Sequence, residues 1–261
     1  RDCDGAVESG DGSTEPDDAH YSSQWALQTV NAPQAWYHAQ GSGVLIAVLD
    51  SGADLDHADL ASKLRTDQWD YVNNDAVAQD DNGHGTHVTG IAAAATDNGL
   101  GVAGLGWQAE VLPIKVLNQD GKGYPSDLAY AIYYATDHGA DVINMSLGAA
   151  GASCPSFLQE AVDYAYAHGV LLVAAAGNEG SNVTSYPANC NHVLGVGSTT
   201  QSDTRSTFSN TGAHVSVSAP GSGIYSTLMG GSYGYKSGTS MATPYVSGLA
   251  ALVFSHYPGY T

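Results

Sequence analysis

Short apolar runs separated by polar, glycine-rich segments recur along the chain from about Tyr21 onward. Five of these runs have the length and composition of buried strands, at residues 44–49, 111–116, 142–145, 170–175 and 193–196. Elsewhere apolar residues recur every three or four positions, which predicts helices over residues 85–95, 126–138, 155–168 and 240–256. Strands that alternate with helices predict an α/β fold with a doubly wound, mostly parallel central sheet flanked by helices.

The N-terminal segment has a different composition from the rest. Residues 1–20 are rich in Gly, Asp, Glu and Ser and hold few apolar residues, so we expect an acidic extended arm outside the core. Residues 21–261 contain no internal repeat and no linker, which predicts one domain. The chain begins at Arg1 without a Met or a signal-like segment, so we expect a mature form whose targeting segment or propeptide has been removed.

The charge balance excludes some partners. Twenty-six acidic and seven basic residues give a formal net charge of −19. This sign opposes binding to phosphate backbones and anionic lipids, and no apolar run is long enough to cross a bilayer, so we expect neither nucleic acid nor membrane as a partner. The charge favours solubility and cation binding; it is compatible with basic substrates, but a heavily hydrated surface is the simpler interpretation.

Three cysteines are too few for a disulfide scaffold and lack the paired spacing of a zinc site. At most one internal bridge can form. We expect it between Cys154 and Cys190, which lie in the same half of the chain near loops assigned below to the active site, whereas Cys3 lies in the predicted arm. The other two pairings stay open.

Three residues stand where catalysis could occur. Asp50 ends a predicted strand in "VLDSG", His84 lies between two glycines in "NGHGTHVTG", and Ser240 opens the last predicted helix. Taken alone, such an Asp is usually a turn residue and such a Ser a helix cap. Together they supply a nucleophile, a base that removes its proton and a carboxylate that orients the base.

The order Asp, His, Ser along the chain is that of subtilisin, and the GxSxG motif of α/β-hydrolases is absent around Ser240. The segments "VLDSG", "NGHGTHVTG", "SLG", "AAAGNEG" and "SGTSMATP" resemble the signature segments of the subtilisin-like serine proteases, peptidase family S8, and are most similar to the thermitase and subtilisin branch. The resemblance implies a secreted serine endopeptidase with broad specificity for extended polypeptides, made as a zymogen with an N-terminal propeptide.

The resemblance also implies roles for individual residues. The Asn178 side chain, with the backbone N–H of Ser240, would stabilise the oxyanion. Substrate would lie extended between two backbone segments and place one side chain in a pocket rimmed by Glu179. Glu179 could admit a basic side chain as well as apolar ones, and the alternative interpretation is an ordinary solvated surface Glu. The substrate-binding residues would be Gly121, Lys122, Gly123, Ser146, Leu147, Gly148, Ala175, Ala176, Gly177 and Glu179.

Calcium is the cofactor that the resemblance implies, bound by hard oxygen ligands. The tighter site would use the side chains of Asp18, Asp59 and Asn98 and the carbonyls of Ala95, Leu100 and Val102. A weaker site would use Asp70, Asn73, Asp75, Gln79 and the Val77 carbonyl. Because Asn73 stands where relatives carry an Asp, this second site is expected to be weak or empty.

The chain ends at Thr261, where members of this family continue through further elements. We therefore expect C-terminal elements to be missing, either because the sequence is a fragment or because the remainder is retained as a second chain that could also hold a partner for Cys3. Two alternative functions compete with the protease. One is a pseudoprotease that binds peptides without cleaving them, which the complete set Asp50, His84, Ser240 and Asn178 disfavours. The other is a narrow processing protease, which would need more acidic pockets than Glu179 supplies.

Overall fold

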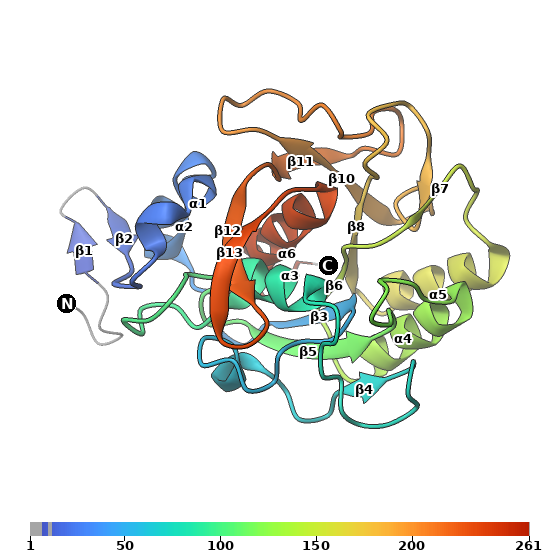
Figure 1. Cartoon of the computed structure of the whole chain (residues 1–261), viewed down its shortest axis with the longest axis horizontal. Coiled ribbons are helices and arrows are strands. Elements are labelled where there is room, and N and C mark those ends of the chain that lie inside the picture. The colour runs from blue at the N-terminus through green and yellow to red at the C-terminus, as the bar shows by residue number, and fades with distance from the viewer. Residues whose placement is uncertain (1–6, 10–11, 261) are drawn as a thin grey trace.

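A seven-stranded sheet forms the centre of the molecule in the computed structural model, which describes residues 7–9 and 12–260 (Figure 1). The strand order is β11-β10-β8-β6-β3-β5-β4, and every neighbouring pair is parallel. This arrangement confirms the predicted doubly wound α/β fold. The strands of the sheet are β3 (Leu45–Asp50), β4 (Trp69–Asp70), β5 (Glu110–Lys115), β6 (Val142–Met145), β8 (Leu171–Ala175), β10 (Val193–Thr199) and β11 (Val217–Pro220).

Helices cover both faces of this sheet, because the central strands are apolar on both sides. In β3, Ile46 and Val48 pack in one hydrophobic cluster with helices α3 (His84–Ala93) and α6 (Thr239–His256). The alternate residues of β3 pack in a second cluster with α4 (Pro125–Asp137) and α5 (Ser156–Ala167). Two short helices, α1 (Trp25–Thr29) and α2 (Ala32–His38), join the first cluster. A strand with two buried faces therefore reads as the continuous apolar run seen in the sequence.

The predicted strands and helices agree with the structure to within two residues at each end, except that the strand predicted over residues 193–196 extends to Thr199 in β10. The shorter elements were not predicted. They are the pairs β1 (Val7–Ser9) with β2 (Ser13–Glu15), β7 (Ala149–Ala150) with β9 (Ser185–Tyr186) and β12 (Ile224–Leu228) with β13 (Ser232–Lys236), and the 3₁₀ turns η1 (Tyr21–Ser23) and η2 (Ala61–Lys63). The sheet strands β4 and β11 and the helices α1 and α2 were not predicted either. Strands of two to five residues rich in Ser, Gly and Tyr carry little periodicity, so hydrophobic pattern does not reveal them.

The described part of the predicted N-terminal arm is folded. Strand β2 belongs to a hairpin and lies beside α2. Ser13, Thr14 and Asp18 are all buried. The segment from residue 12 to residue 20 thus differs from the expected arm outside the core, because its polar residues are buried by contacts that composition does not encode. The expectation for residues 1–6 and 10–11, including Cys3, lies outside the described residues.

The chain order places a ligand-binding position at the middle of the sheet. After β3 the chain forms β4 and β5 on one side, then crosses to β6 on the other side of β3. In open α/β sheets, ligands bind at the carboxyl ends of the strands where the order reverses in this way. Asp50 ends β3, and Ser146 directly follows β6. These two residues therefore mark the position where the site is expected.

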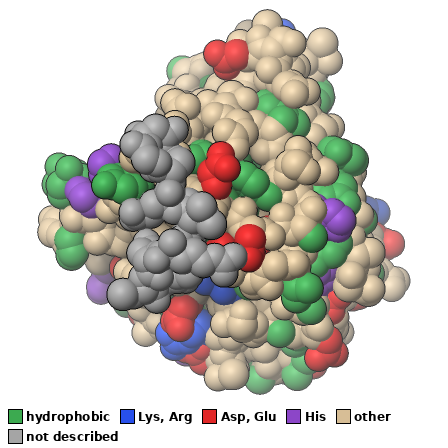
Figure 2. All heavy atoms as spheres, turned by 90° about the vertical axis from the view of Figure 1, so that its left-hand side faces the viewer, with side chains coloured by type: hydrophobic (Ala, Val, Ile, Leu, Met, Phe, Trp, Pro, Cys, Tyr) green, Lys and Arg blue, Asp and Glu red, His purple; other side chains and the backbone are tan. Residues whose placement is uncertain are grey.

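On the face at the left of Figure 1, acidic, basic, histidine and hydrophobic side chains are interspersed among other side chains and the backbone (Figure 2). Within the described residues, no helix has the length and apolar content needed to cross a membrane.

The disulfide joins Cys154 to Cys190, as expected from the sequence. The two cysteines follow the strands of the small β7–β9 pair, in which Ala149 lies opposite Tyr186 and Ala150 opposite Ser185. The bridge therefore holds together two loops that have only two residues each in regular pairing.

We expect Cys154→Ser to lower the free energy of unfolding by about 3 kcal/mol, because the bridge closes a loop with a sequence separation of 36 and removes entropy from the unfolded chain. Chemical denaturation measures this change. Ser153→Ala, at an exposed neighbouring position, is the matched control, and Cys190→Ser in addition should cost little more. An unchanged unfolding midpoint in Cys154→Ser would contradict a stabilising bridge.

Candidate active site

His84 and Asp50 form a direct hydrogen bond. The His84 Nδ1 atom lies 2.7 Å from Asp50 Oδ1, and the Asp50 side chain is wholly buried while 26% of the His84 side chain is exposed. Asp50 Oδ1 also accepts a hydrogen bond of 2.7 Å from the Ser51 backbone. A carboxylate that accepts from Nδ1 fixes the tautomer with Nε2 unprotonated, so Nε2 is available as a base.

Two glycines allow this approach. Gly52 has a φ of +99°, a conformation that residues with a side chain rarely adopt. Gly85 follows His84, and a Cβ atom on it would overlap with the carbonyl oxygen of Gly52. The turn after β3 and the first turn of α3 can therefore pack backbone against backbone, which brings Asp50 and His84 together.

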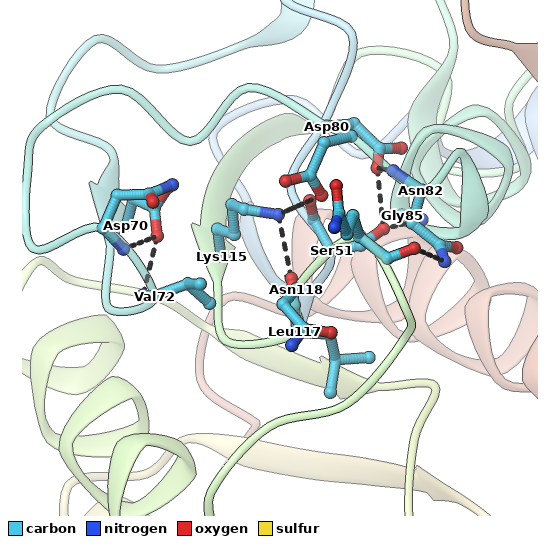
Figure 3. A network of polar contacts seen from close by, with 12 residues as sticks. Ser51, Asp70, Val72, Asp80, Asn82, Gly85, Lys115, Leu117 and Asn118 are labelled. Carbon is cyan, nitrogen blue, oxygen red and sulfur yellow. Dashed lines mark hydrogen bonds and ion pairs between the residues drawn. The ribbon is translucent and has the colours of Figure 1, made fainter.

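A buried carboxylate fixes the loop before His84. Asp80 Oδ1 accepts hydrogen bonds from Ser51 Oγ at 2.8 Å and from Gly83 N at 2.8 Å, and Asp80 Oδ2 accepts from the backbone and hydroxyl of Thr86. Ser51 Oγ in turn accepts from Gly85 N at 2.9 Å. Asp80 thus ties the residues after Asp50 to those on both sides of His84 (Figure 3).

Beneath this loop lies a buried cation. The Lys115 side chain is 1% exposed, and its Nζ donates to the carbonyls of Ser51 at 2.9 Å and Leu117 at 2.8 Å and pairs with Asp81 at 2.6 Å (Figure 3). Lys115 lies opposite Asp50 in the β3–β5 register. It therefore links the strand that carries Asp50 to the next strand and to the loop before His84.

The environment of His84 sets its protonation. Burial opposes the charged imidazolium, but the charge of Asp50 and the hydrogen bond to it outweigh burial and raise the His84 pKa above its ordinary value. Lys236 acts in the opposite direction and Asp80 in the same direction as Asp50. By contrast His87, which lies one turn later and is fully buried, has its pKa lowered to about 3 by burial. His87 is a packed helix residue that stays neutral.

Ser240 is the second residue of α6, and Pro244 explains part of its setting. In a regular helix the Ser240 carbonyl would accept a hydrogen bond from the N–H of residue 244. Residue 244 is a proline, which has no N–H, so this bond cannot form. Ser146 Oγ donates to that carbonyl instead, at 2.8 Å. Asn144 holds Ser146 through a bond of 3.0 Å and accepts from Ser247 of α6 at 2.8 Å. The start of α6 is thereby attached to the end of β6.

Two N–H donors near Ser240 remain available. The Ser240 backbone N–H has no acceptor among the described residues, as expected in the first turn of a helix. Asn178 Oδ1 accepts from Thr239 N at 2.8 Å and Thr239 Oγ1 at 3.0 Å, which leaves the Nδ2 group of Asn178 for another partner. A Cβ atom placed on Gly238 would lie 3.6 Å from Ser240 N and 3.8 Å from Asn178 Nδ2. The two nitrogen atoms therefore lie close to the same point in space beside Gly238.

One cavity of about 480 Å³ connects these groups. It is lined by His84, Ser240 and Asn178 and by all the predicted substrate-binding residues except one, namely Gly121, Lys122, Gly123, Ser146, Leu147, Gly148, Ala175, Gly177 and Glu179. Ala176 is absent from the lining, because it is fully buried and its carbonyl accepts from Asn210 at 3.2 Å and His214 at 3.1 Å. Ala176 therefore lies behind its neighbours Ala175 and Gly177, which line the cavity.

The lining also includes residues that were not predicted, chiefly Asn82, Leu117, Tyr124, Leu128, Ala149, Ala150, Ser185 and Tyr186. Several of these belong to the β7–β9 pair that the disulfide holds. Glu179 at the rim is positioned by Asn210, whose Nδ2 donates to Glu179 Oε2 at 2.6 Å. Asn210 is buried and comes from a loop that no motif marks, so sequence reasoning did not find it.

Comparison with known proteins agrees with this geometry. The model of the subtilase family, Peptidase S8, matches residues 41–261 of the chain. The chain belongs to the subtilase family. It is therefore a serine endopeptidase of the subtilisin type, as predicted.

This subtilase is similar in sequence and structure to several named proteases. Thermitase from Thermoactinomyces vulgaris is 48% identical over 241 residues, which are 92% of this chain and 85% of thermitase. Subtilisin DY from Bacillus licheniformis is 43% identical over 223 residues, 84% of this chain and 79% of the relative. Among solved structures, a protease from Pseudoalteromonas arctica has a TM-score of 0.89 at 37% identity and covers 94% of this chain and 88% of its own.

The subtilase brings the side chains of the first predicted calcium site together. Asp59 is fully buried and accepts from Asn98 Nδ2 at 2.8 Å and from Val102 N at 2.8 Å. Asp18 Oδ2 accepts from the Asp97 backbone at 2.9 Å, but Asp18 Oδ1 is buried with no hydrogen-bond partner among the described residues. Burial, supported by the charge of Asp59, raises the Asp18 pKa to about 6.

These observations fit a cation better than an empty pair of carboxylates. A buried carboxylate oxygen without a donor costs free energy unless a positive charge compensates it. Within the described residues, no group of three or more His, Cys, Asp or Glu side chains could hold a metal, so amide and backbone oxygens such as those of Asn98, Ala95, Leu100 and Val102 would have to complete the ligand set.

The second predicted calcium site is arranged differently. Asp70 Oδ2 accepts from Asn73 Nδ2 at 2.8 Å, and Asp70 Oδ1 accepts from the Val72 and Asn73 backbones. Asp75 Oδ1 accepts from Val77 N at 2.9 Å, and Gln79 Oε1 is directed to Leu55 N at 3.2 Å. Amide groups donate to the carboxylates here as they do to Asp59, but no oxygen of Asp70 or Asp75 is buried without a hydrogen-bond partner, in contrast to Asp18 Oδ1. Asn73 supplies a donor where a carboxylate would supply a ligand.

We expect the pKa of His84 to lie above 6.5 in the folded protein and to fall in Asp50→Asn, because the carboxylate is the main group that favours the imidazolium. Histidine NMR titration in a Ser240→Ala background measures both values without interference from autolysis. Because the folded pKa is raised, protonation of His84 stabilises the fold fully below pH 6.5, and this contribution is lost as pH rises through the folded pKa. A His84 pKa that does not fall in Asp50→Asn would contradict the assigned interaction.

Proposed function

We propose that this subtilase hydrolyses peptide bonds through a triad of Ser240, His84 and Asp50 and a covalent acyl-enzyme. The observation that carries the proposal is the 2.7 Å bond between His84 Nδ1 and buried Asp50 Oδ1, formed at the edge of the cavity that Ser240 also lines. With Nδ1 held by Asp50, His84 Nε2 takes the proton of the Ser240 hydroxyl as the oxygen attacks the substrate carbonyl carbon.

The tetrahedral intermediate then collapses in two stages. His84 passes the proton to the leaving amine, the C–N bond breaks, and the acyl group stays on Ser240 Oγ. Water attacks this ester with His84 again as the base, and the acid product leaves with the Ser240 hydroxyl restored. The oxyanion would accept hydrogen bonds from Asn178 Nδ2 and Ser240 N, which border one position. Loss of one such donor lowers kcat about 100- to 1,000-fold in subtilisin, the relative for which this magnitude is known.

Substrate recognition relies on the backbone. We infer that a peptide lies extended between residues 121–123 and 146–148, both of which line the cavity. Main-chain pairing binds many sequences, which accounts for broad specificity. The side chain before the scissile bond would enter the space bordered by Gly148, Ala175, Gly177 and Glu179. Small residues there admit large apolar groups, and the Glu179 carboxylate admits a basic one.

Calcium is proposed as a structural ion at the Asp18 site. Asp18, Asp59 and Asn98 would hold it with nearby carbonyls, and the ion would join the N-terminal segment to the loops around residues 59 and 98–102. The orphaned Asp18 Oδ1 atom supports this assignment. At the second site, amide groups already donate hydrogen bonds to Asp70, so we propose no tight calcium binding there.

We further propose that the enzyme is secreted after removal of an N-terminal propeptide. The disulfide supports an oxidising compartment, and relatives include an extracellular protease from Xanthomonas campestris. Its partners would then be polypeptide substrates and, during maturation, its own propeptide.

Ser240→Ala should reduce hydrolysis of an internally quenched peptide to background while leaving the thermal unfolding transition intact, because only the nucleophile is removed. The assay compares initial rates with those of Ser42→Ala, an exposed serine outside the cavity lining. Continued cleavage at the same bonds by Ser240→Ala would remove Ser240 from this role.

Calcium should raise the melting temperature of metal-stripped protein, since an ion bound only by the native state stabilises it by mass action. Asp18→Asn should have opposite effects on the melting temperature without calcium and on the increase that calcium causes. Its metal-free form melts at a higher temperature because the unpaired buried charge is gone, and its calcium-induced increase is smaller.

Calorimetry with and without calcium in an inactive Ser240→Ala background separates these effects. Asp75→Asn is the control and should keep the full calcium response. A calcium response that survives in Asp18→Asn and disappears in Asp75→Asn would contradict the assignment of the tighter site.

A further inference from the structure

Lys236 ends strand β13 four residues before Ser240. Its Nζ donates a hydrogen bond of 3.0 Å to the carbonyl of Gly83, the residue directly before His84. The ammonium group is thus held beside the histidine, and its charge lowers the His84 pKa, opposing Asp50. An ammonium has three donors, so further N–H groups remain for a ligand.

The surroundings of Lys236 place it away from the acyl part of the cleft. Lys236 and the other hairpin residues are absent from the lining of the cavity that holds residues 121–123, 146–148 and Glu179. Met229, at the turn of the same hairpin, lies against Gly83. In the proposed reaction His84 gives its proton to the leaving amine, so the side of His84 opposite the acyl cavity receives the residue after the scissile bond.

Lys236 is one of seven basic residues in a chain that has 26 acidic ones. Arg65 pairs with Asp67 and Lys115 pairs with Asp81. Lys236 has no ion pair with any described residue. The carboxylates of the neighbouring loops are engaged elsewhere, since Asp54 Oδ2 accepts from Gly230 N at 2.8 Å and both Asp80 oxygens accept from the His84 loop. The ammonium is held in place without a carboxylate partner.

We propose that Lys236 determines specificity on the leaving-group side by binding an Asp or Glu carboxylate at the first residue after the scissile bond. This inference rests on the proposed function of the Ser240 site. A free ammonium beside the leaving group attracts an acidic side chain and repels a basic one, whereas the rest of this acidic protein does the reverse at long range. The preference therefore comes from one short-range contact against an unfavourable background.

The test uses internally quenched peptides that differ only in the residue after the cleaved bond, which is Asp, Asn or Lys. Wild-type protein should show kcat/KM roughly ten-fold higher for Asp than for Lys at low ionic strength, with Asn between them, the sum of one favourable and one unfavourable partly exposed charge contact. Added salt should reduce this ratio because it screens both contacts.

K236M should bring the Asp-to-Lys ratio to one or below, and K236R should keep Asp preferred. R205M removes an equal charge at an exposed position outside the cavity lining and should retain the wild-type ratio. Mass spectrometry of the products confirms that the same bond is cleaved, and thermal unfolding confirms that K236M is folded.

The outcomes separate this inference from the proposed function. Cleavage of all three peptides at similar rates by wild-type protein, or an Asp-to-Lys ratio unchanged in K236M, would overturn the role of Lys236 while leaving the triad intact. No cleavage of any peptide by wild-type protein would instead overturn the proposed function.

Discussion

The arrangement around the catalytic cleft depends on one buried interaction, the hydrogen bond between Asp50 and His84. A carboxylate with no exposed surface is costly unless donors and a nearby positive charge compensate it. Asp50 Oδ1 accepts from the Ser51 backbone and lies 2.7 Å from His84 Nδ1, whereas Asp50 Oδ2 is buried without a hydrogen-bond partner among the described residues. The pair is held in position by backbone contacts that Gly52 and Gly85 permit, by Asp80, which joins the two loops, and by the buried Lys115 below them. Changes in any of these would act on catalysis through the position of the imidazole.

The sequence was sufficient for the parts of the fold that have strong periodicity. Central strands such as residues 44–49 are apolar on both faces, and α4 and α5 carry apolar residues at helical spacing, so their existence and type followed from pattern alone. The β12–β13 hairpin did not, because its residues owe their positions to contacts with α3, for example Thr227 with the Thr86 carbonyl at 2.8 Å. The buried polar residues of the N-terminal segment were missed for the same reason.

For the site, the residues with named chemistry were accessible from sequence, since Asp50, His84 and Ser240 occur in distinctive segments. Their supporting residues were not. In the sequence, Lys115 is one charged residue at the end of an apolar strand, and Asn210 is an ordinary loop residue. In the structure, each makes several buried hydrogen bonds to residues of the site. Such roles depend on which atoms meet across the fold, and short motifs hold no information about that.

The proline in α6 has a mechanical consequence. Because Pro244 has no N–H, the Ser240 carbonyl accepts a hydrogen bond of 2.8 Å from Ser146 Oγ instead. This bond connects the first turn of the helix to the segment that would pair with substrate. Thermal displacement of one is then transmitted to the other. If a peptide binds along residues 146–148 as proposed, this hydrogen bond couples its position to that of Ser240, the proposed nucleophile, and such fixed positioning raises the effective molarity of a reacting group.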